Sequence, residues 1–286
     1  MIIIDFHTHT FPDPLAAAAL EKLQAASHTR PFTNGTVSAL EQSMTEAGIS
    51  ASVVLPVATN ARQVPHVNDA SIALNVRGAE TGVFSFGCMH PEFAEYRQEL
   101  ARLAAAGVKG IKLHPVYQGV DFDDARYLRI LERAGELGLV VLVHAGLDVG
   151  FPGAEQAVPQ KIERAMRAVG PLTLVLAHMG GWRCWAEAEA LLAGSGAYID
   201  TSFSLGQMTP NGDGHYKTEA ELALLDGESF VRMVRSFGAE RVLFGTDCPW
   251  GDQAAEVRRF LSLPFTEDER ARILYKNAVD LLDLRE

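Results

Sequence analysis

The sequence predicts a single (β/α)₈ TIM barrel with extra C-terminal helices, spanning residues 1–286 as one domain. Eight short apolar, β-branched runs recur along the chain, and segments with helical apolar spacing lie between them. Several helical segments end in a glycine that directly precedes the next run, as at Gly107, Gly138 and Gly170. No glycine-rich phosphate turn follows an early run, so a barrel is favoured over a doubly wound open sheet.

The predicted strands are spaced evenly enough for one repeating unit. They cover residues 2–6, 52–57, 83–88, 109–114, 139–144, 172–178, 197–202 and 241–247. The shortest step between successive starts, from residue 172 to 197, is 25 residues. Every step is therefore long enough for a helix to cross between two parallel strands.

The segments between the strands carry the helical patterns. The clearest cover residues 94–106, 125–138, 160–169 and 230–237. The two longest connections, 10–36 and 203–229, follow the first and seventh strands, and the glycines of the second predict a mobile loop. After the last strand, Thr266 and Glu269 have the spacing of a capping box. This predicts one or two helices that close the barrel exterior.

Composition narrows the classes of partner. The formal charge of −11, from 25 Lys and Arg against 36 Asp and Glu, disfavours a nucleic acid partner. No apolar run approaches the roughly 20 residues that cross a bilayer, and no signal-peptide pattern opens the chain. The three cysteines lie far apart and do not form a disulfide pattern. We therefore expect a cytoplasmic protein that binds a small molecule, with no nucleic acid or membrane partner.

Residues that bind metals in other proteins end several of the predicted strands, where barrel enzymes carry their chemistry. His7 and His9 point to the same side of the first strand, with Cα atoms about 7 Å apart, so both can approach one ion. The alternative is a pair of hydrogen-bonded surface histidines. His144, His178 and Asp247 end the fifth, sixth and eighth strands. Their equivalent positions favour one shared site.

The fourth strand adds a lysine and a histidine that alternation directs into the lumen. Lys112 needs a partner or a shifted pKa in such a place, so it either has a functional role or pairs with a carboxylate such as Asp200 or Asp247. His114 is equally well a substrate contact or a structural residue. Asp200, which ends the seventh strand, is weaker evidence for a site because the two hydroxyl residues after it can satisfy its carboxylate.

Imidazole and carboxylate ligands with open positions suit Zn²⁺, and also Mn²⁺, Fe²⁺ or Co²⁺. Four aromatic residues follow strand ends and form either the rim of a substrate pocket or ordinary packing. They are Tyr117, Phe151, Trp182 and Trp250. The remaining histidines and the cysteines receive no role.

Together these motifs resemble the amidohydrolase superfamily, and more closely its amidohydrolase-2 branch, which includes aminocarboxymuconate-semialdehyde decarboxylase and related lactonases and hydrolases. The resemblance covers essentially the whole chain. It rests on Asp5-Phe6-His7-Thr8-His9, Gly110-Ile111-Lys112-Leu113-His114-Pro115, Val143-His144-Ala145-Gly146, Ala177-His178-Met179-Gly180-Gly181 and Phe244-Gly245-Thr246-Asp247-Cys248-Pro249-Trp250.

The resemblance implies a metal site with one or two divalent ions. The implied metal ligands are His7, His9, His144 and Asp247. His178 matches a histidine that commonly acts near the metal-bound water. Lys112 lies on the strand where binuclear members carry a carboxylated lysine, but a free amine can instead bind a substrate carboxylate. We favour one ion, Zn²⁺ first, with an unmodified Lys112, over two ions bridged by a carboxylated Lys112.

We expect a hydrolase that cleaves an amide or ester (lactone) bond of a small molecule with metal-activated water. Asp247 would take the proton of this water, and His178, Lys112 or the metal would stabilise the oxyanion. The expected substrate-binding residues are Lys112, His114, Tyr117, Trp182 and Trp250.

Three other functions compete with hydrolysis. One is non-oxidative decarboxylation of an unsaturated or aromatic carboxylate at the same site. Another is ligand binding without catalysis, which the number of ionisable groups at one face argues against. A TatD-like nuclease also begins with His-x-His, but its fourth strand ends in glutamate, where this chain has Lys-Leu-His. The family also makes a homodimer plausible.

Overall fold

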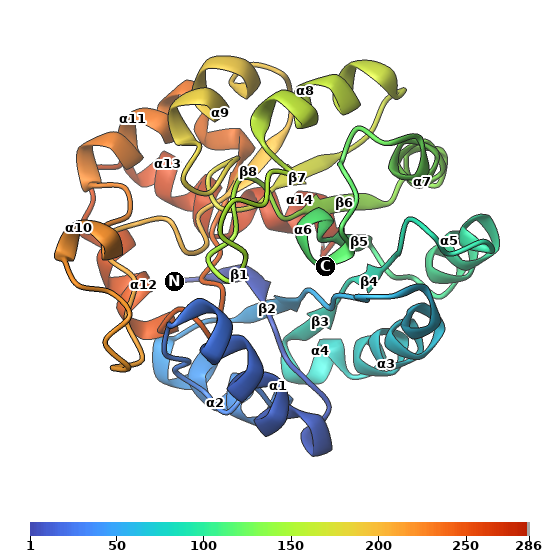
Figure 1. The fold of residues 1–286 in the computed structure, drawn as a ribbon. Coiled ribbons are helices and arrows are strands. Elements are labelled where there is room, and N and C mark those ends of the chain that lie inside the picture. The colour runs from blue at the N-terminus through green and yellow to red at the C-terminus, as the bar shows by residue number, and fades with distance from the viewer. Residues whose placement is uncertain (285–286) are drawn as a thin grey trace.

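The computed structural model describes residues 1–284, in which parallel strands form the centre and helices surround them (Figure 1). The predicted domain, 1–286, includes residues 285–286, which lie outside the described part. A helical segment separates successive strands of the central layer, except between the third and the fourth, which follow each other directly. The predicted (β/α)₈ barrel is confirmed.

The first strand is as long as its predicted run but begins two residues later, and the other strands are shorter than the apolar runs that predicted them. They are β1 (Ile4–Thr8), β2 (Ala51–Val54), β3 (Val83–Ser85), β4 (Gly87–Cys88), β5 (Gly110–Leu113), β6 (Val140–Val143), β7 (Leu174–Leu176), β8 (Tyr198–Asp200) and β9 (Val242–Leu243). The third predicted strand is divided between β3, which pairs with β2, and β4, which pairs with β5. The division marks the point at which this run changes its hydrogen-bonded neighbour.

Backbone hydrogen bonds join the last strand to the first. The N–H of Phe6 donates to the carbonyl of Phe244 at 2.8 Å, and the N–H of Asp247 donates to the carbonyl of His7 at 2.8 Å. The parallel ladders β1-β2-β3 and β4-β5-β6-β7-β8-β9 are thereby connected into a ring. This closure brings the two ends of the sequence, and the polar residues that they carry, to one place.

The helices form the outer layer. They are α1 (Asp13–Ser27), α2 (Val37–Ala47), α3 (Val64–Val76), α4 (Gly78–Thr81), α5 (Tyr96–Ala105), α6 (Pro115–Gln118), α7 (Ala125–Glu136), α8 (Pro159–Ala168), α9 (Trp185–Leu192), α10 (Glu219–Leu222), α11 (Gly227–Phe237), α12 (Gln253–Leu261), α13 (Glu267–Ala271) and α14 (Asn277–Leu282). Alternation along the strands separates two layers of core: Val141 and Val143 pack in one with the helices, and Val140 and Leu142 pack in the other. Each fully buried side chain of this kind contributes about 1.5–3 kcal/mol.

The C-terminal helices and the long connections behave largely as their sequences indicate. Thr266 and Glu269 form the predicted capping box of α13. A π-helical segment, Arg272–Lys276, joins α13 to α14 and receives a hydrogen bond from the N–H of Phe244 at 3.0 Å. Bridges between Leu205 and Leu225 and between Gln207 and Ala223 hold the base of the connection 203–229, whose mobility stays a prediction. None of the described helices is long and apolar enough to cross a membrane.

Candidate metal centre

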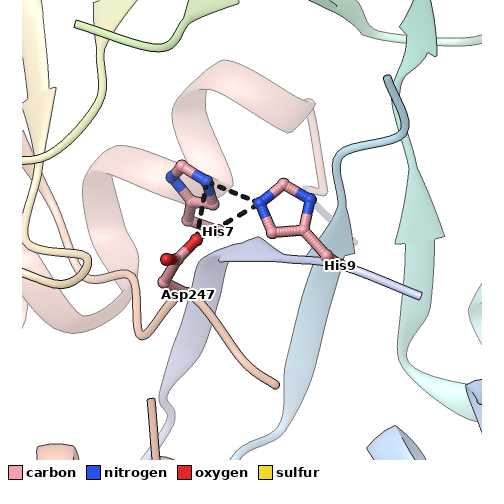
Figure 2. A group of neighbouring side chains, drawn as sticks. All are labelled: His7, His9 and Asp247. Atoms are coloured by element: carbon pink, nitrogen blue, oxygen red, sulfur yellow. Dashed lines mark hydrogen bonds and ion pairs between the residues drawn. The ribbon is translucent and has the colours of Figure 1, made fainter. Parts of the chain in front are cut away.

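The ends of β1 and β9 bring three metal-binding side chains into direct proximity (Figure 2). Nε2 of His7 lies 3.1 Å from Nε2 of His9. Oδ1 of Asp247 lies 3.3 Å from the first nitrogen and 3.2 Å from the second. His7 is fully buried, while the His9 side chain keeps 18% exposure. The three ligand atoms therefore converge on one point at the carboxyl end of the barrel.

The outer nitrogens of these two imidazoles fix which atom faces the cluster. Nδ1 of His7 lies 2.7 Å from Oδ2 of Asp200, and Nδ1 of His9 lies 2.8 Å from the carbonyl of Leu55. Both partners are acceptors, so each neutral ring carries its proton on Nδ1 and turns the lone pair of Nε2 toward Asp247. Such outer-sphere acceptors are the usual companions of metal-bound histidines.

His144 and His178 follow β6 and β7 and repeat the same orientation. Nε2 of His144 faces the carbonyl of Leu147 at 2.9 Å, and Nδ1 of His178 faces the carbonyl of Ser202 at 3.1 Å. Their remaining nitrogens, Nδ1 of His144 and Nε2 of His178, lie 3.1 Å apart with no proton between them. The ring centroid of His178 is 5.1 Å from that of His7, so the two pairs adjoin.

This arrangement fits a divalent cation. Five lone-pair atoms lie in two adjoining sets, and burying them together is costly unless positive charge, beyond that of the Lys112 ammonium near His7, lies among them. They are Nε2 of His7, His9 and His178, Nδ1 of His144 and Oδ1 of Asp247. The structure brings His7, His9 and Asp247 into mutual contact, and places His144 beside them through His178.

Burial keeps the imidazoles neutral. It lowers the pKa of His7 and His144 well below the usual value, and it also lowers the pKa of His178. Burial acts to raise the pKa of Asp247, but the nearby imidazoles of His9, His7 and His178 outweigh this effect and lower the pKa to about 2. Neutral imidazoles and an ionised carboxylate are the forms that bind a metal.

Asp200, which the sequence indicates only weakly as a site residue, contacts the side of this cluster that lies away from the facing lone pairs. One carboxylate oxygen of Asp200 accepts from the His7 ring. The other accepts from the Ser202 hydroxyl at 2.5 Å and from the backbone N–H of His178 at 3.0 Å. One buried carboxylate therefore orients histidines from two different strands. Of the two hydroxyl residues predicted to satisfy this carboxylate, Ser202 does so, whereas the Thr201 hydroxyl donates to the carbonyl of Gly245 at 2.9 Å. The oxygen of Asp200 that Ser202 does not contact faces His7.

A second buried carboxylate, Asp5, joins the strand ends below the ligands. It accepts from the N–H and hydroxyl of Thr246 at 3.0 and 2.5 Å and from Nε2 of Gln253 at 2.7 Å. Asp247, which directly follows Thr246 in the sequence, has a backbone φ of +65°, and His178 has a backbone φ of +58°. Left-handed conformations are uncommon for residues with a side chain and concentrate at functional sites.

Lys112 lies inside the lumen, as alternation predicts. Its side chain is 1% exposed, and Nζ lies 3.3 Å from Nε2 of His7. Burial lowers its pKa to about 8, although Asp200 and Asp247 act in the opposite direction. Within residues 1–284, no carboxylate oxygen lies within 4.0 Å of Nζ. The ammonium is therefore close to the cluster without being neutralised by an ion pair.

A further group of two histidines and a carboxylate lies on the other side of His144. Nε2 of His114 and Nε2 of His144 are each 3.6 Å from Oδ2 of Asp148. The two rings stack with centroids 4.2 Å apart and planes 11° apart. Because imidazole lone pairs lie in the ring plane, stacked rings cannot both direct them at one ion, and we do not assign a second metal to this group.

The predicted rim residues divide between two places. Tyr117 stacks on His114 with centroids 3.8 Å apart, and Phe151 lies 5.2 Å from Tyr117. Trp182 is buried near Phe203, at 6.3 Å, and its indole N–H has no hydrogen-bond partner among the described residues. Trp250 follows Asp247 and is partly exposed. Only Tyr117 directly contacts one of the polar residues predicted for the pocket.

Sequence reasoning missed Asp148 and Ser202. Asp148 follows β6 in a loop, four residues after His144, where no strand periodicity reaches it. Ser202 was considered only as a partner of Asp200. A polar residue shortly after a strand-end histidine was the one available signal for either residue.

Comparison with known proteins gives the fold and the family. Similar solved structures include an uncharacterized TIM-barrel protein from Bordetella bronchiseptica (TM-score 0.72, 19% identity, 99% of both chains). A dihydroxybenzoic acid decarboxylase from a Polaromonas species, with bound manganese and an inhibitor, has a TM-score of 0.67 at 17% identity over 100% of this chain and 97% of that one. A protein named as a 2-pyrone-4,6-dicarboxylic acid hydrolase from Pseudomonas putida has a TM-score of 0.65 at 19% identity over 99% and 98%.

No curated protein sequence matches the chain. The amidohydrolase family model of the amidohydrolase-2 branch matches residues 4–284, which is nearly the whole sequence. Members of this family are metal-dependent enzymes, with hydrolases and decarboxylases among them. The chain therefore belongs to the amidohydrolase family.

Proposed function

We propose that this chain is a metal-dependent hydrolase that cleaves an amide or ester (lactone) bond of a small molecule. The observation that carries the proposal is the contact of Asp247 Oδ1 with the facing Nε2 atoms of His7 and His9, at 3.3 and 3.2 Å. These residues, with His144, would hold one divalent ion, for which nitrogen and carboxylate ligands favour Zn²⁺. The manganese in the Polaromonas structure makes Mn²⁺ the next candidate.

A bound divalent ion supplies an acidified water and polarises a carbonyl. Asp247 is the carboxylate placed to accept the proton of that water and to deliver it to the leaving group. Lys112, buried 3.3 Å from His7, is the cation placed to stabilise negative charge that develops on a substrate oxygen. Burial of both side chains excludes water and strengthens these interactions.

Decarboxylation is the second candidate, because the same buried ammonium suits a substrate carboxylate and a structure of similar fold is a decarboxylase. The two reactions differ in mass balance. The protein loaded with Zn²⁺ or Mn²⁺ should be screened against lactones, aryl esters, amides and aromatic carboxylates by mass spectrometry. Products whose masses sum to that of the substrate plus one water support hydrolysis, and a product lighter by CO₂ overturns it in favour of decarboxylation.

Replacement of Asp247 tests its role in turnover. Asp247→Asn keeps the side-chain shape but cannot accept the proton, so kcat should fall by about 10²–10⁴-fold on any substrate found in the screen. Asp252→Asn is the matched control, because Asp252 only caps α12 and asparagine caps a helix equally well. A kcat for Asp247→Asn within tenfold of the parent enzyme would contradict the assignment.

A further inference from the structure

His114 and Asp148 form a polar pair on the face of His144 that is turned away from His178. Oδ1 of Asp148 accepts from the N–H of Gly150 at 2.8 Å, while Oδ2 lies 3.6 Å from Nε2 of His114. A separation of 3.6 Å is too long for a hydrogen bond. Both side chains keep 6–7% exposure. The space between the two atoms is therefore not closed by a hydrogen bond.

The backbone assigns the proton of His114. Nδ1 accepts from the N–H of Tyr117 at 3.4 Å, so the neutral ring carries its proton on Nε2. His114 thus offers an N–H to the space, and Asp148 offers an acceptor. One oxygen that bears a hydrogen can bridge them, by accepting from His114 and donating to Asp148.

The surrounding charges and rings narrow the group that can bind there. The Asp148 carboxylate repels an anion, and the N–H of His114 turns the positive end of its dipole toward the same place, which disfavours a cation. Tyr117 stacks on His114, and Phe151, which is 46% exposed, continues the aromatic surface 5.2 Å away. A neutral polar group attached to a flat, apolar ring fits this wall.

We propose that His114 and Asp148 form a subsite that recognises a hydroxyl group on the ring of the substrate. This inference rests on the proposed function, since the metal centre beyond His144 would hold the carbonyl that reacts. The substrate class is then a hydroxylated cyclic or aromatic ester, lactone or amide. An unmatched buried acceptor and donor would penalise an analogue that lacks the hydroxyl.

A hydroxamate binds a metal ion through its hydroxamate group, so a ring hydroxyl at its other end can reach the subsite. The effect of that hydroxyl on the Kd then measures recognition by the subsite. We would titrate the zinc-loaded protein with benzohydroxamate and with its 3-hydroxy and 4-hydroxy derivatives by calorimetry. One hydroxy derivative should bind about tenfold more tightly than the parent compound. This preference should disappear in Asp148→Asn, which turns an N–H donor toward His114, and in His114→Phe, which keeps the stack but removes the donor.

Asp121→Asn is the matched control, because Asp121 pairs with Lys161 at the surface, and it should retain the full preference. Equal Kd values for the three hydroxamates in the wild type would overturn the subsite and leave the metal centre intact. A preference that survives in both Asp148→Asn and His114→Phe would overturn it as well. Failure of the protein to take up zinc would overturn the metal centre, whereas failure of every hydroxamate to bind a zinc-loaded protein would overturn the subsite alone.

Discussion

Two groups of two histidines and one aspartate lie at the same end of this barrel, and they differ in what they offer to a ligand. His7, His9 and Asp247 turn only lone pairs toward one another. In the other group the nitrogen nearest Asp148, Nε2 of both His114 and His144, carries the proton, because Nδ1 of His114 accepts from the Tyr117 N–H and Nε2 of His144 donates to the carbonyl of Leu147. The outer hydrogen-bond partner of each ring, rather than the residue type, decides its role.

The angle between the two imidazole planes is a second difference between the groups. The planes of His7 and His9 cross at 72°, so their lone pairs can meet at one point in space. The planes of His114 and His144 lie 11° apart. Convergence is thus a property of the first pair only, and His144 contributes to the metal centre through its other nitrogen.

The largest expected effect is the loss of the metal ion when a histidine of the first group is replaced, and its retention when a histidine of the second group is replaced. His9→Ala removes a converging lone pair and should lower metal affinity by more than about 100-fold, since even outer partners contribute 10–100-fold. His114→Ala should retain the metal, because its Nε2 is a donor. Metal per chain would be measured by elemental analysis after dialysis, with circular dichroism to establish that both variants fold.

The outcome that would remove the distinction is equal metal content in the two variants. Loss from His114→Ala with retention in His9→Ala would reverse the assignment of the groups. Because His9 is partly exposed, its replacement leaves only a small cavity.

The positions of the candidate metal ligands could be predicted from the sequence, but their protonation could not. Spacing of two along a strand placed His7 and His9 on one side, and strand ends placed His144, His178 and Asp247 at the same face. The carbonyls that orient the rings belong to other segments: Leu55 follows β2, and Leu147 lies in a loop. No local pattern reveals such a partner.

The same limit explains why Asp148 was missed and Asp200 undervalued. Asp148 is five residues beyond β6, and its approach to His114 depends on how two loops fold over adjacent strands. Asp200 reaches His7 only because β9 closes against β1, which places β8 near the first strand. Barrel closure was predicted, but the register that selects this contact was not.

Asp200→Asn should produce a smaller loss of metal than His9→Ala. Three donors face Oδ1 of Asp200, so the amide oxygen of asparagine would take that place and its NH₂ would face His7. His7 would then carry its proton on Nε2 and lose the lone pair for the metal. We expect metal affinity to fall about 10–100-fold in competition with a chromophoric chelator.

The surface variant Asp121→Asn controls for the change of charge. An affinity for Asp200→Asn equal to that of the wild type would show that Asp200 does not set the tautomer of His7. Thermal unfolding of the metal-free variant would separate a loss of stability from a loss of affinity.

The smallest expected effect is a change in metal affinity when Lys112 is replaced. The sign of this change distinguishes a free lysine from a carboxylated one. An ammonium 3.3 Å from Nε2 of His7 repels a cation bound there, so Lys112→Met should bind Mn²⁺ about tenfold more tightly than the wild type at pH 7. The pKa of Lys112 is lowered to about 8 by burial, so the wild-type lysine loses its charge as the pH rises through 8. The advantage of the variant should therefore shrink between pH 7 and pH 9. Hydrolysis of the metal ion itself affects both proteins equally and cancels in the ratio of their affinities.

A carboxylated Lys112 would carry negative charge and bridge two ions, so weaker binding by Lys112→Met at both pH values would overturn the single-ion centre with a free lysine.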